Sequence, residues 1–177
     1  MYFSTFPTSV YDIKGDGNKK LVTDLFRRVK VREKVLNEFS LYEYYQVPNG
    51  ESPETTAYKH FGSADYHWVI LMTNSITDRY YDWPLSDQDF ELFITNKYAN
   101  PDGIHHYEIT KSSGKLTGNG PDDYSHKIEV NSTVAGSAPV SNREYEQRLQ
   151  DKKRKIRLLN PQFLATFIEE FETLLNR

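Results

Sequence analysis

The sequence predicts an α+β fold, in which short strands and helices occupy separate stretches of the chain. A tyrosine-rich strand is expected at 41–47, and two helical stretches follow it. Two alternating segments beyond residue 100 predict a β-hairpin, and the clearest helical periodicity lies after residue 141. We therefore expect an extended N-terminal arm, a compact centre, a hairpin flap and C-terminal helices.

Four segments follow from this pattern. They are an N-terminal arm with a basic strand at 1–40, a core with its following helix at 41–99, a hairpin or flexible flap at 100–140 and a C-terminal helical segment at 141–177. In the flap, the strands IHHYEIT and HKIEVN are expected to flank a Ser-Ser-Gly turn. A chain of 177 residues is long enough to bury a core.

Composition excludes several kinds of site. The 22 basic and 25 acidic residues give a net charge of -3, so no general attraction to nucleic acid or to anionic membranes is expected. The absence of cysteine excludes disulfides, thiolate zinc sites and cysteine nucleophiles. No secretory signal is visible, and the longest apolar run, 68–72, is far shorter than the roughly 20 residues that span a bilayer. We expect a soluble protein made in a cytoplasm.

One basic segment of the arm has two interpretations. In FRRVKVR, at 26–32, Val29 and Val31 alternate with Arg28, Lys30 and Arg32, which predicts a strand with valines on one face and cations on the other. It is either a half-solvated strand whose cations prevent unwanted strand pairing, or a basic edge that meets an acidic partner.

Capping residues predict the central helices. Ser52 is expected to cap a helix that has Pro53 in its first position and ends at Gly62. Asn74 is the expected left-handed stop of the next helix, and Ser86 opens another that ends near Asn100-Pro101. Their inward-facing residues are expected to be Tyr66, Val69, Ile70 and Thr73 in the one, and Phe90, Phe93 and Ile94 in the other.

Two helices are predicted at the C-terminal end. Ser141 and Glu144 form a capping box, and apolar or long side chains continue the helical period through 159, so the basic run KKRKIR at 152–157 is expected on a solvated helix face. Asn160 is the expected cap of the second helix. Its apolar stripe is expected to pack on the protein body or on another subunit; it comprises Leu164, Ile168, Phe171 and Leu175, flanked by Phe163, Phe167 and Leu174.

No catalytic set, metal site or cofactor site is predicted. His105 and His106 are adjacent in a strand, so their side chains should point to opposite faces. Asp12, Asp16 and Asn18 lack the spacing of a calcium loop and predict a turn. Phosphate-binding loops and nucleophile elbows are missing from the sequence.

The central stretch resembles the LysM module. The residues that carry the resemblance are Tyr45-x-Val47, Gly50-Glu51-Ser52, Ala57, Phe61-Gly62, Trp68, Leu71 and Asn74. The resemblance implies a βααβ core that binds N-acetylglucosamine polymers such as peptidoglycan or chitin, although no clear second strand follows in the sequence. The implied groove residues are Gly50, Glu51, Ser52, Pro53, Asn74, Ser75, Ile76 and Thr77.

Most of the chain is similar to the baseplate wedge subunit fifty-three family of contractile-tailed bacteriophages. The segments that carry this similarity are TDLFRR, LYEYYQVPNGESPE, FGSADYHWVILMTNSITDRYYDWPLS and NREYEQRLQDKKRKIRLL. It implies a virion protein without enzymatic activity that joins neighbouring wedges around the central hub during tail assembly. Its implied partners are other wedge proteins, sheath-initiator proteins and hub proteins, with no cofactor, nucleic acid or membrane.

Two functions therefore stand side by side, a baseplate structural component and, as the alternative, a LysM-type glycan-binding module. Trp68 is expected in the core, whereas the 80–84 cluster is either a core plug or an interface anchor. The candidate interface residues are Arg27, Arg28, Tyr80, Tyr81, Trp83, Phe167 and Phe171.

Overall fold

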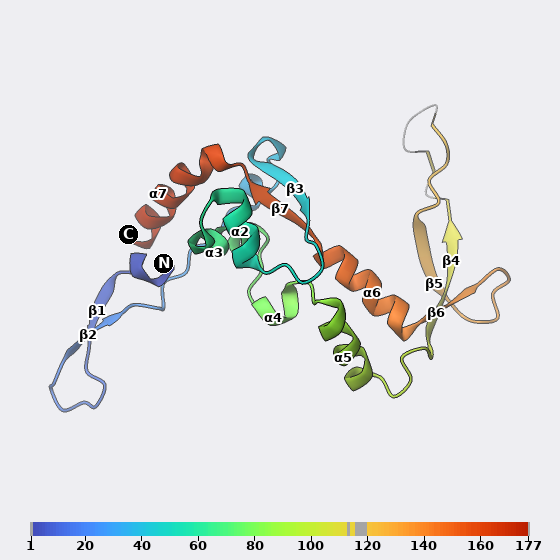
Figure 1. Ribbon diagram of the computed structural model, residues 1–177, viewed down its shortest axis with the longest axis horizontal. Helices are drawn as coiled ribbons and strands as arrows, with labels where there is room; N and C mark the ends of the chain where they lie inside the picture. The colour runs from blue at the N-terminus through green and yellow to red at the C-terminus, as the bar shows by residue number, and fades with distance from the viewer. Residues whose placement is uncertain (1, 113, 116–119, 177) are drawn as a thin grey trace. The chain divides into compact units, whose positions relative to one another are not determined.

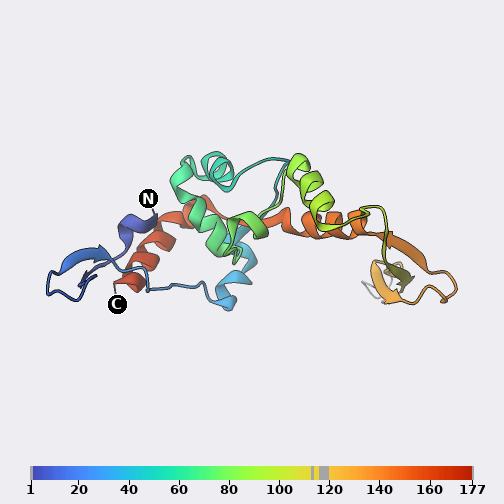
Figure 2. The same ribbon diagram turned by 90° about the horizontal axis from the view of Figure 1, so that it is seen from below.

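The computed structural model describes residues 2–112, 114–115 and 120–176 and confirms the α+β class (Figures 1 and 2). The chain forms two compact units, one of Met1–Pro84 with Lys153–Arg177 and one of Leu85–Lys152. These boundaries fall inside the segments 41–99 and 141–177 that the sequence pattern suggested. The second unit is thus an insertion into the first.

A two-stranded antiparallel sheet organises the first unit. Strand β3 (Tyr42–Gln46) pairs with β7 (Lys155–Leu159), and α2 (Pro53–Phe61) and α3 (His67–Thr73) follow β3 in the chain (Figure 1). The order is therefore β–α–α–β, and its last strand, β7, comes from the part of the chain that follows the second unit. The likeness of this unit to a LysM module stays a prediction.

The sequence prediction of one helix from 141 through 159 is wrong. Helix α6 (Asn142–Lys153) ends before the basic run does, and Lys155–Leu159 is β7. In a strand Ile156 and Leu158 share one face, and both are buried. The partner strand β3 lies more than a hundred residues earlier, so local periodicity did not reveal the pairing.

The cap of α2 is confirmed and that of α3 is corrected. The Ser52 hydroxyl accepts the Thr55 N–H at 3.2 Å, and Gly62 ends α2 with a φ of 78°. Asn74 has a φ of -100°, and the left-handed residue is Ser75 at 57°. The Asn74 amide instead bonds the backbone of Arg157: its Nδ2 donates to the Arg157 carbonyl at 2.8 Å, and its Oδ1 accepts the Arg157 N–H at 2.8 Å.

The core of the first unit surrounds this sheet. Its central cluster joins residues of α2, α3 and β7 with the residues that directly follow β3 and α4, namely Val47, Ala57, Ile70, Trp83, Ile156 and Leu158. A second cluster contains Tyr42, Val69 and Leu159. Helix α7 (Leu164–Leu175) packs on the body of its own unit, where the Phe171 ring lies 4.7 Å from that of Trp68.

The N-terminal arm folds back on itself as a hairpin of β1 (Thr8–Tyr11) and β2 (Lys20–Thr23). Asp12 accepts backbone N–H groups of its turn, those of Gly15 and Gly17 among them. The predicted strand at 26–32 is not formed, because the structure gives this segment no partner strand. Short helices follow at α1 (Glu33–Leu36) and α4 (Arg79–Asp82), with 3-10 turns at Tyr2–Thr5, Phe39–Leu41, Ala64–Tyr66 and Pro161–Phe163.

The second unit contains α5 (Asp87–Lys97) and a three-stranded sheet in the order β5-β4-β6. The predicted hairpin of β4 (Ile104–Lys111) and β5 (His126–Val130) is confirmed, whereas β6 (Ala138–Ser141) was not predicted. Residue 113 of the expected turn lies outside the described residues.

Side-chain caps of later helices agree with the sequence prediction in two of three cases. The hydroxyls of Ser86 and Ser141 each accept a backbone N–H at 3.1 Å, from Asp89 and Glu144 respectively. Asn160 makes no side-chain cap, and its amide instead donates to the Ser40 carbonyl at 3.0 Å.

We expect Asn74→Ala to lower the free energy of unfolding by roughly 2 kcal/mol, since it removes two hydrogen bonds to Arg157 and leaves part-buried backbone groups of Arg157 without these partners. Urea unfolding followed by Trp fluorescence measures the loss. The control is Asn176→Ala, because the Asn176 amide bonds only the exposed Glu172 carbonyl of its own helix. Equal effects of the two substitutions would contradict the structural role of Asn74.

Candidate interaction surfaces

A buried carboxylate lies at the start of α2. The Glu51 side chain accepts hydrogen bonds from the hydroxyls of Tyr45 at 2.9 Å and Thr56 at 2.8 Å, and it forms an ion pair with Lys59. Burial raises the pKa of Glu51, but the hydrogen bonds from Lys59, Thr56 and Tyr45 outweigh burial and leave the pKa below its usual value. Burial, with the neighbouring Glu51, raises the pKa of Tyr45 to about 12. Glu51 is therefore saturated by groups of its own chain.

The residues of the implied sugar groove have diverse environments. Among those at 50–53, Glu51 and Pro53 are buried and Ser52 caps α2, so Gly50 is the exposed residue of this loop. Asn74 bonds Arg157, Ile76 packs on the central core cluster, and Ser75 and Thr77 are exposed. Most of the polar side chains that a sugar would need are thus engaged within the protein.

An apolar groove runs between the arm and α3. Its volume is about 630 Å³, and Trp68, Leu71 and Met72 contribute its α3 side. The arm contributes the opposite side, which includes Tyr2, Phe3 and the segment at 28–30. Trp68 is half-buried here, packed on Phe171 and open to the groove, so the prediction of a core tryptophan holds for part of its surface. Sequence reasoning missed this groove, because its walls are about forty residues apart.

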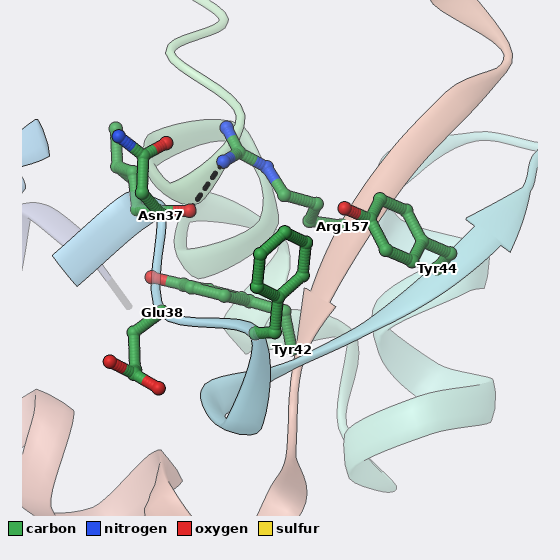
Figure 3. A pocket seen from close by; sticks show the side chains of 7 residues that line it. Asn37, Glu38, Tyr42, Tyr44 and Arg157 are labelled. Atoms are coloured by element: carbon green, nitrogen blue, oxygen red, sulfur yellow. Dashed lines mark hydrogen bonds between the residues drawn. The ribbon is translucent and has the colours of Figure 1, made fainter. Parts of the chain in front are cut away.

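A second, smaller pocket of about 320 Å³ adjoins β3 and α1 (Figure 3). Arg157 crosses it, donating to the Leu36 carbonyl at 2.6 Å and lying 5.7 Å from the centre of the Tyr42 ring. Burial raises the pKa of Tyr42, whose hydroxyl has no hydrogen-bond partner among the described residues. With its guanidinium tied to backbone carbonyls, Arg157 connects β7 to the arm.

The candidate interface residues separate into exposed and buried groups. Tyr80 and Tyr81 on α4 are 81% and 73% exposed. Trp83 is buried, with its Nε1 donating to the Glu51 carbonyl at 2.8 Å, and Phe171 is buried against Trp68. The remaining three candidates are the half-buried Phe167, the exposed Arg28, and Arg27, which donates to the Leu175 carbonyl. The two buried aromatics belong to the core, and the exposed residues define surfaces.

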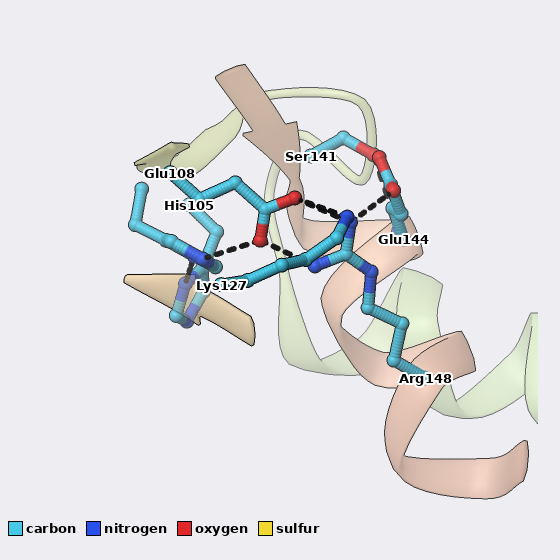
Figure 4. Close-up of polar contacts among 7 residues, drawn as sticks. His105, Glu108, Lys127, Ser141, Glu144 and Arg148 are labelled. Atoms are coloured by element: carbon cyan, nitrogen blue, oxygen red, sulfur yellow. Dashed lines mark hydrogen bonds and ion pairs between the residues drawn. The ribbon is translucent and has the colours of Figure 1, made fainter. Parts of the chain in front are cut away.

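The second unit has its own charged centre (Figure 4). Glu108 accepts from Arg148 through both guanidinium ends at 2.7 and 2.9 Å and from Lys127 at 2.6 Å. Hydrogen bonds from Arg148, helped by those from Lys127, lower the pKa of Glu108 to about 2. This carboxylate joins α6 to the sheet.

The two adjacent histidines do not diverge as the strand prediction required. A register shift in β4 between Ile104 and His106 brings their Nδ1 atoms to 2.9 Å, and the His105 ring stacks on Tyr145 at 3.9 Å. Across the part of the chain that the structure describes, no three His, Cys, Asp or Glu side chains gather as a metal site would require. Within the same residues, no helix has the length and apolar character needed to cross a bilayer.

These features define an α+β protein in which each of the two units has a buried carboxylate bonded by its own side chains, and in which exposed aromatic and basic side chains form surfaces. The family described as Base plate wedge protein 53 matches residues 1–115, and the chain belongs to this family. Over 83 residues it is 32% identical to baseplate wedge protein gp53 of Enterobacteria phage T4. That match covers 46% of this chain and 42% of the T4 protein, so the chain spans less than half of its relative's length there.

The Glu51 environment generates a prediction on glycan binding. Because its carboxylate is saturated and Ser52 caps a helix, we expect no saturable binding of chitin oligomers at millimolar concentration. Isothermal titration with N-acetylglucosamine oligomers measures this, with a hen-egg-type lysozyme as the positive control. Saturable binding that drops in Glu51→Gln or Ile76→Ala would restore the LysM-type function.

The Glu108 centre generates a prediction on pH. A carboxyl group whose folded pKa is depressed to about 2 contributes stability that is complete above the usual pKa of 4.5 and is lost as pH falls toward 2. We expect Glu108→Gln to remove about 2 kcal/mol of unfolding free energy at pH 7 and much less at pH 2. Urea unfolding at a series of pH values measures the difference. Asp151→Asn, at an exposed position on α6 whose carboxylate bonds Gln147, is the control, and a pH-independent loss in Glu108→Gln would contradict the mechanism.

Proposed function

We propose that this chain is a structural component of a phage tail baseplate wedge that joins neighbouring wedges around the central hub during tail assembly. The observation that carries the proposal is membership of the Base plate wedge protein 53 family over residues 1–115. Its partners are other wedge proteins, together with sheath-initiator and hub proteins. Its location is the baseplate of the virion, after synthesis in the host cytoplasm.

The distribution of exposed side chains supports a role in contacts with several neighbours. Large apolar side chains are exposed on the β1–β2 hairpin, after β2 and on α4, and examples are Leu21, Phe26 and Tyr80. A two-stranded hairpin is marginally stable in water by itself, so the arm gains from a partner that covers it. Such separated apolar surfaces are typical of proteins that contact more than one partner.

The charged groups support a role without catalysis. Two strongly bonded carboxylates are satisfied within their own units: Glu51 by Tyr45, Thr56 and Lys59, and Glu108 by Arg148 and Lys127. A general acid, general base or metal ligand needs access to substrate or metal. We therefore assign no enzymatic activity, cofactor, nucleic acid or membrane to the proposed function.

Sedimentation tests the proposal. We expect the purified chain to co-sediment with the wedge complex encoded in the same genome and to promote the closure of wedges into rings. The readout is analytical ultracentrifugation with negative-stain imaging of the product. A chain that remains a free species beside intact wedges, and is absent from assembled tails, would overturn the proposed function.

We expect the α4 tyrosines to contribute to this binding. Replacement of Tyr80 and Tyr81 by Ala removes two exposed aromatic side chains of the kind that anchor interfaces, and should weaken wedge binding roughly tenfold. Tyr124→Ala, a 60% exposed tyrosine of the second unit, is the matched control. Unchanged binding by the double variant would remove α4 from the interface.

A further inference from the structure

The basic segment after β2 has the side-chain pattern of a strand without a partner strand. Val29 and Val31 are half-buried, whereas Arg28, Lys30 and Arg32 are exposed, so the alternation predicted from the sequence is present in the burial. No backbone hydrogen bond joins Arg28–Val31 to another described residue. Extended backbone with free N–H and C=O groups is a template for the addition of another strand.

The apolar groove described above lies against this segment. Val29, Trp68 and Met72 all pack against the buried cluster of Phe6, Phe171 and Leu175 and line the groove, and the cations at 28 and 30 line it as well. If another strand paired with this edge, the residue opposite Val29 would place its side chain on the same face as Val29, because paired residues of two strands share a face. Every second side chain of such a strand would meet the groove, and the others would meet the cations.

The charge of the groove is uncompensated. The described residues that line it include Arg28 and Lys30 but no acid. Neither cation makes a hydrogen bond or an ion pair with another residue in the described part of the chain, whereas nearby Arg27 is bonded to the Leu175 carbonyl. An acidic ligand would supply the missing complement.

We propose that the edge at 28–31 takes up an extended segment of another protein as an added strand, and that this segment alternates acidic with apolar side chains. The acidic side chains pair with Arg28 and Lys30, and the apolar ones enter the groove beside Val29, Trp68 and Met72. The partner is taken from the assembly of the proposed function, and in this respect the inference rests on that function. The recognition itself depends only on the groove and the open edge.

A labelled synthetic peptide tests the inference. The probe is a ten-residue peptide of alternating Glu and Leu, and its binding to the full chain is measured by fluorescence anisotropy against the same peptide with Lys in place of Glu. We expect the acidic peptide alone to bind, and Arg28→Glu with Lys30→Glu to weaken it by a factor of about ten or more. The matched control is Lys19→Glu with Lys34→Glu, which makes the same charge change at exposed positions outside the groove.

Amide hydrogen exchange separates an added strand from other occupants. We expect the acidic peptide to protect amides of Arg28–Val31, because alternate N–H groups of a strand edge become donors to the new partner. Equal binding of both peptides, binding without protection, displacement by chitin oligomers, or a chain that dimerises through this edge without peptide would each overturn the proposal.

The outcome is distinguishable from that of the proposed function. If Arg28→Glu with Lys30→Glu co-sediments with wedges as strongly as the unmodified chain does, the added strand is excluded from the wedge contact and the wedge role stands. If the unmodified chain binds and is protected by the acidic peptide but does not co-sediment with wedges, the edge is supported and the wedge role fails.

Discussion

The pairing of β3 with β7 is the constraint on which the first unit depends. Residues Tyr42–Gln46 and Lys155–Leu159 lie more than a hundred positions apart, and their register sets Tyr42 opposite Leu159 and Gln46 opposite Lys155. This register determines which β7 side chains face the helices. A slip of one residue would expose Ile156 and Leu158, both buried in the central cluster, so the hydrophobic pattern fixes the pairing.

Polar side chains then hold the surrounding elements to this sheet. The side-chain amide of Asn74, just after α3, bonds the backbone of Arg157 in the way that a residue of a paired strand does: it donates to the Arg157 carbonyl and accepts the Arg157 N–H. Arg157 extends the connection further, to the carbonyl of Leu36 at the end of the arm and to that of Thr73 in α3. One residue of β7 therefore fixes two other elements, although the segment that contains it has the composition of an exposed basic stretch.

Helix starts could be predicted from the sequence, because they depend on neighbouring residues, whereas the pairing of strands far apart in the chain could not. The helix starts at Ser52, Ser86 and Ser141 were predictable because a cap involves residues three positions apart. The strand at 155–159 was assigned to a helix, since the spacing of its apolar residues continued the preceding period and its partner was remote. The candidate surfaces show the same limit. Tyr80 and Tyr81 could be named as interface candidates, although the sequence left open whether their cluster was core or interface, and both are exposed. The groove could not be predicted, because only tertiary packing brings Trp68 to the arm.

The attachment of the second unit explains how such a distant pairing is compatible with a long insertion. The residues just before and just after the insertion are both bonded near the loop that follows β3. Trp83, before it, donates to the Glu51 carbonyl, and the Arg154 carbonyl, after it, accepts the Val47 N–H at 2.9 Å. The first-unit residues that flank the insertion are thus fixed within their own unit. The entropic cost of closing a loop rises only slowly with its length. The insertion also neutralises its buried carboxylates from within itself, Glu108 with Arg148 and Lys127, and Glu146 with Lys97. Each unit thus bonds its buried carboxylates with its own side chains, and substitutions within the insertion leave the groups that bond Glu51 in place.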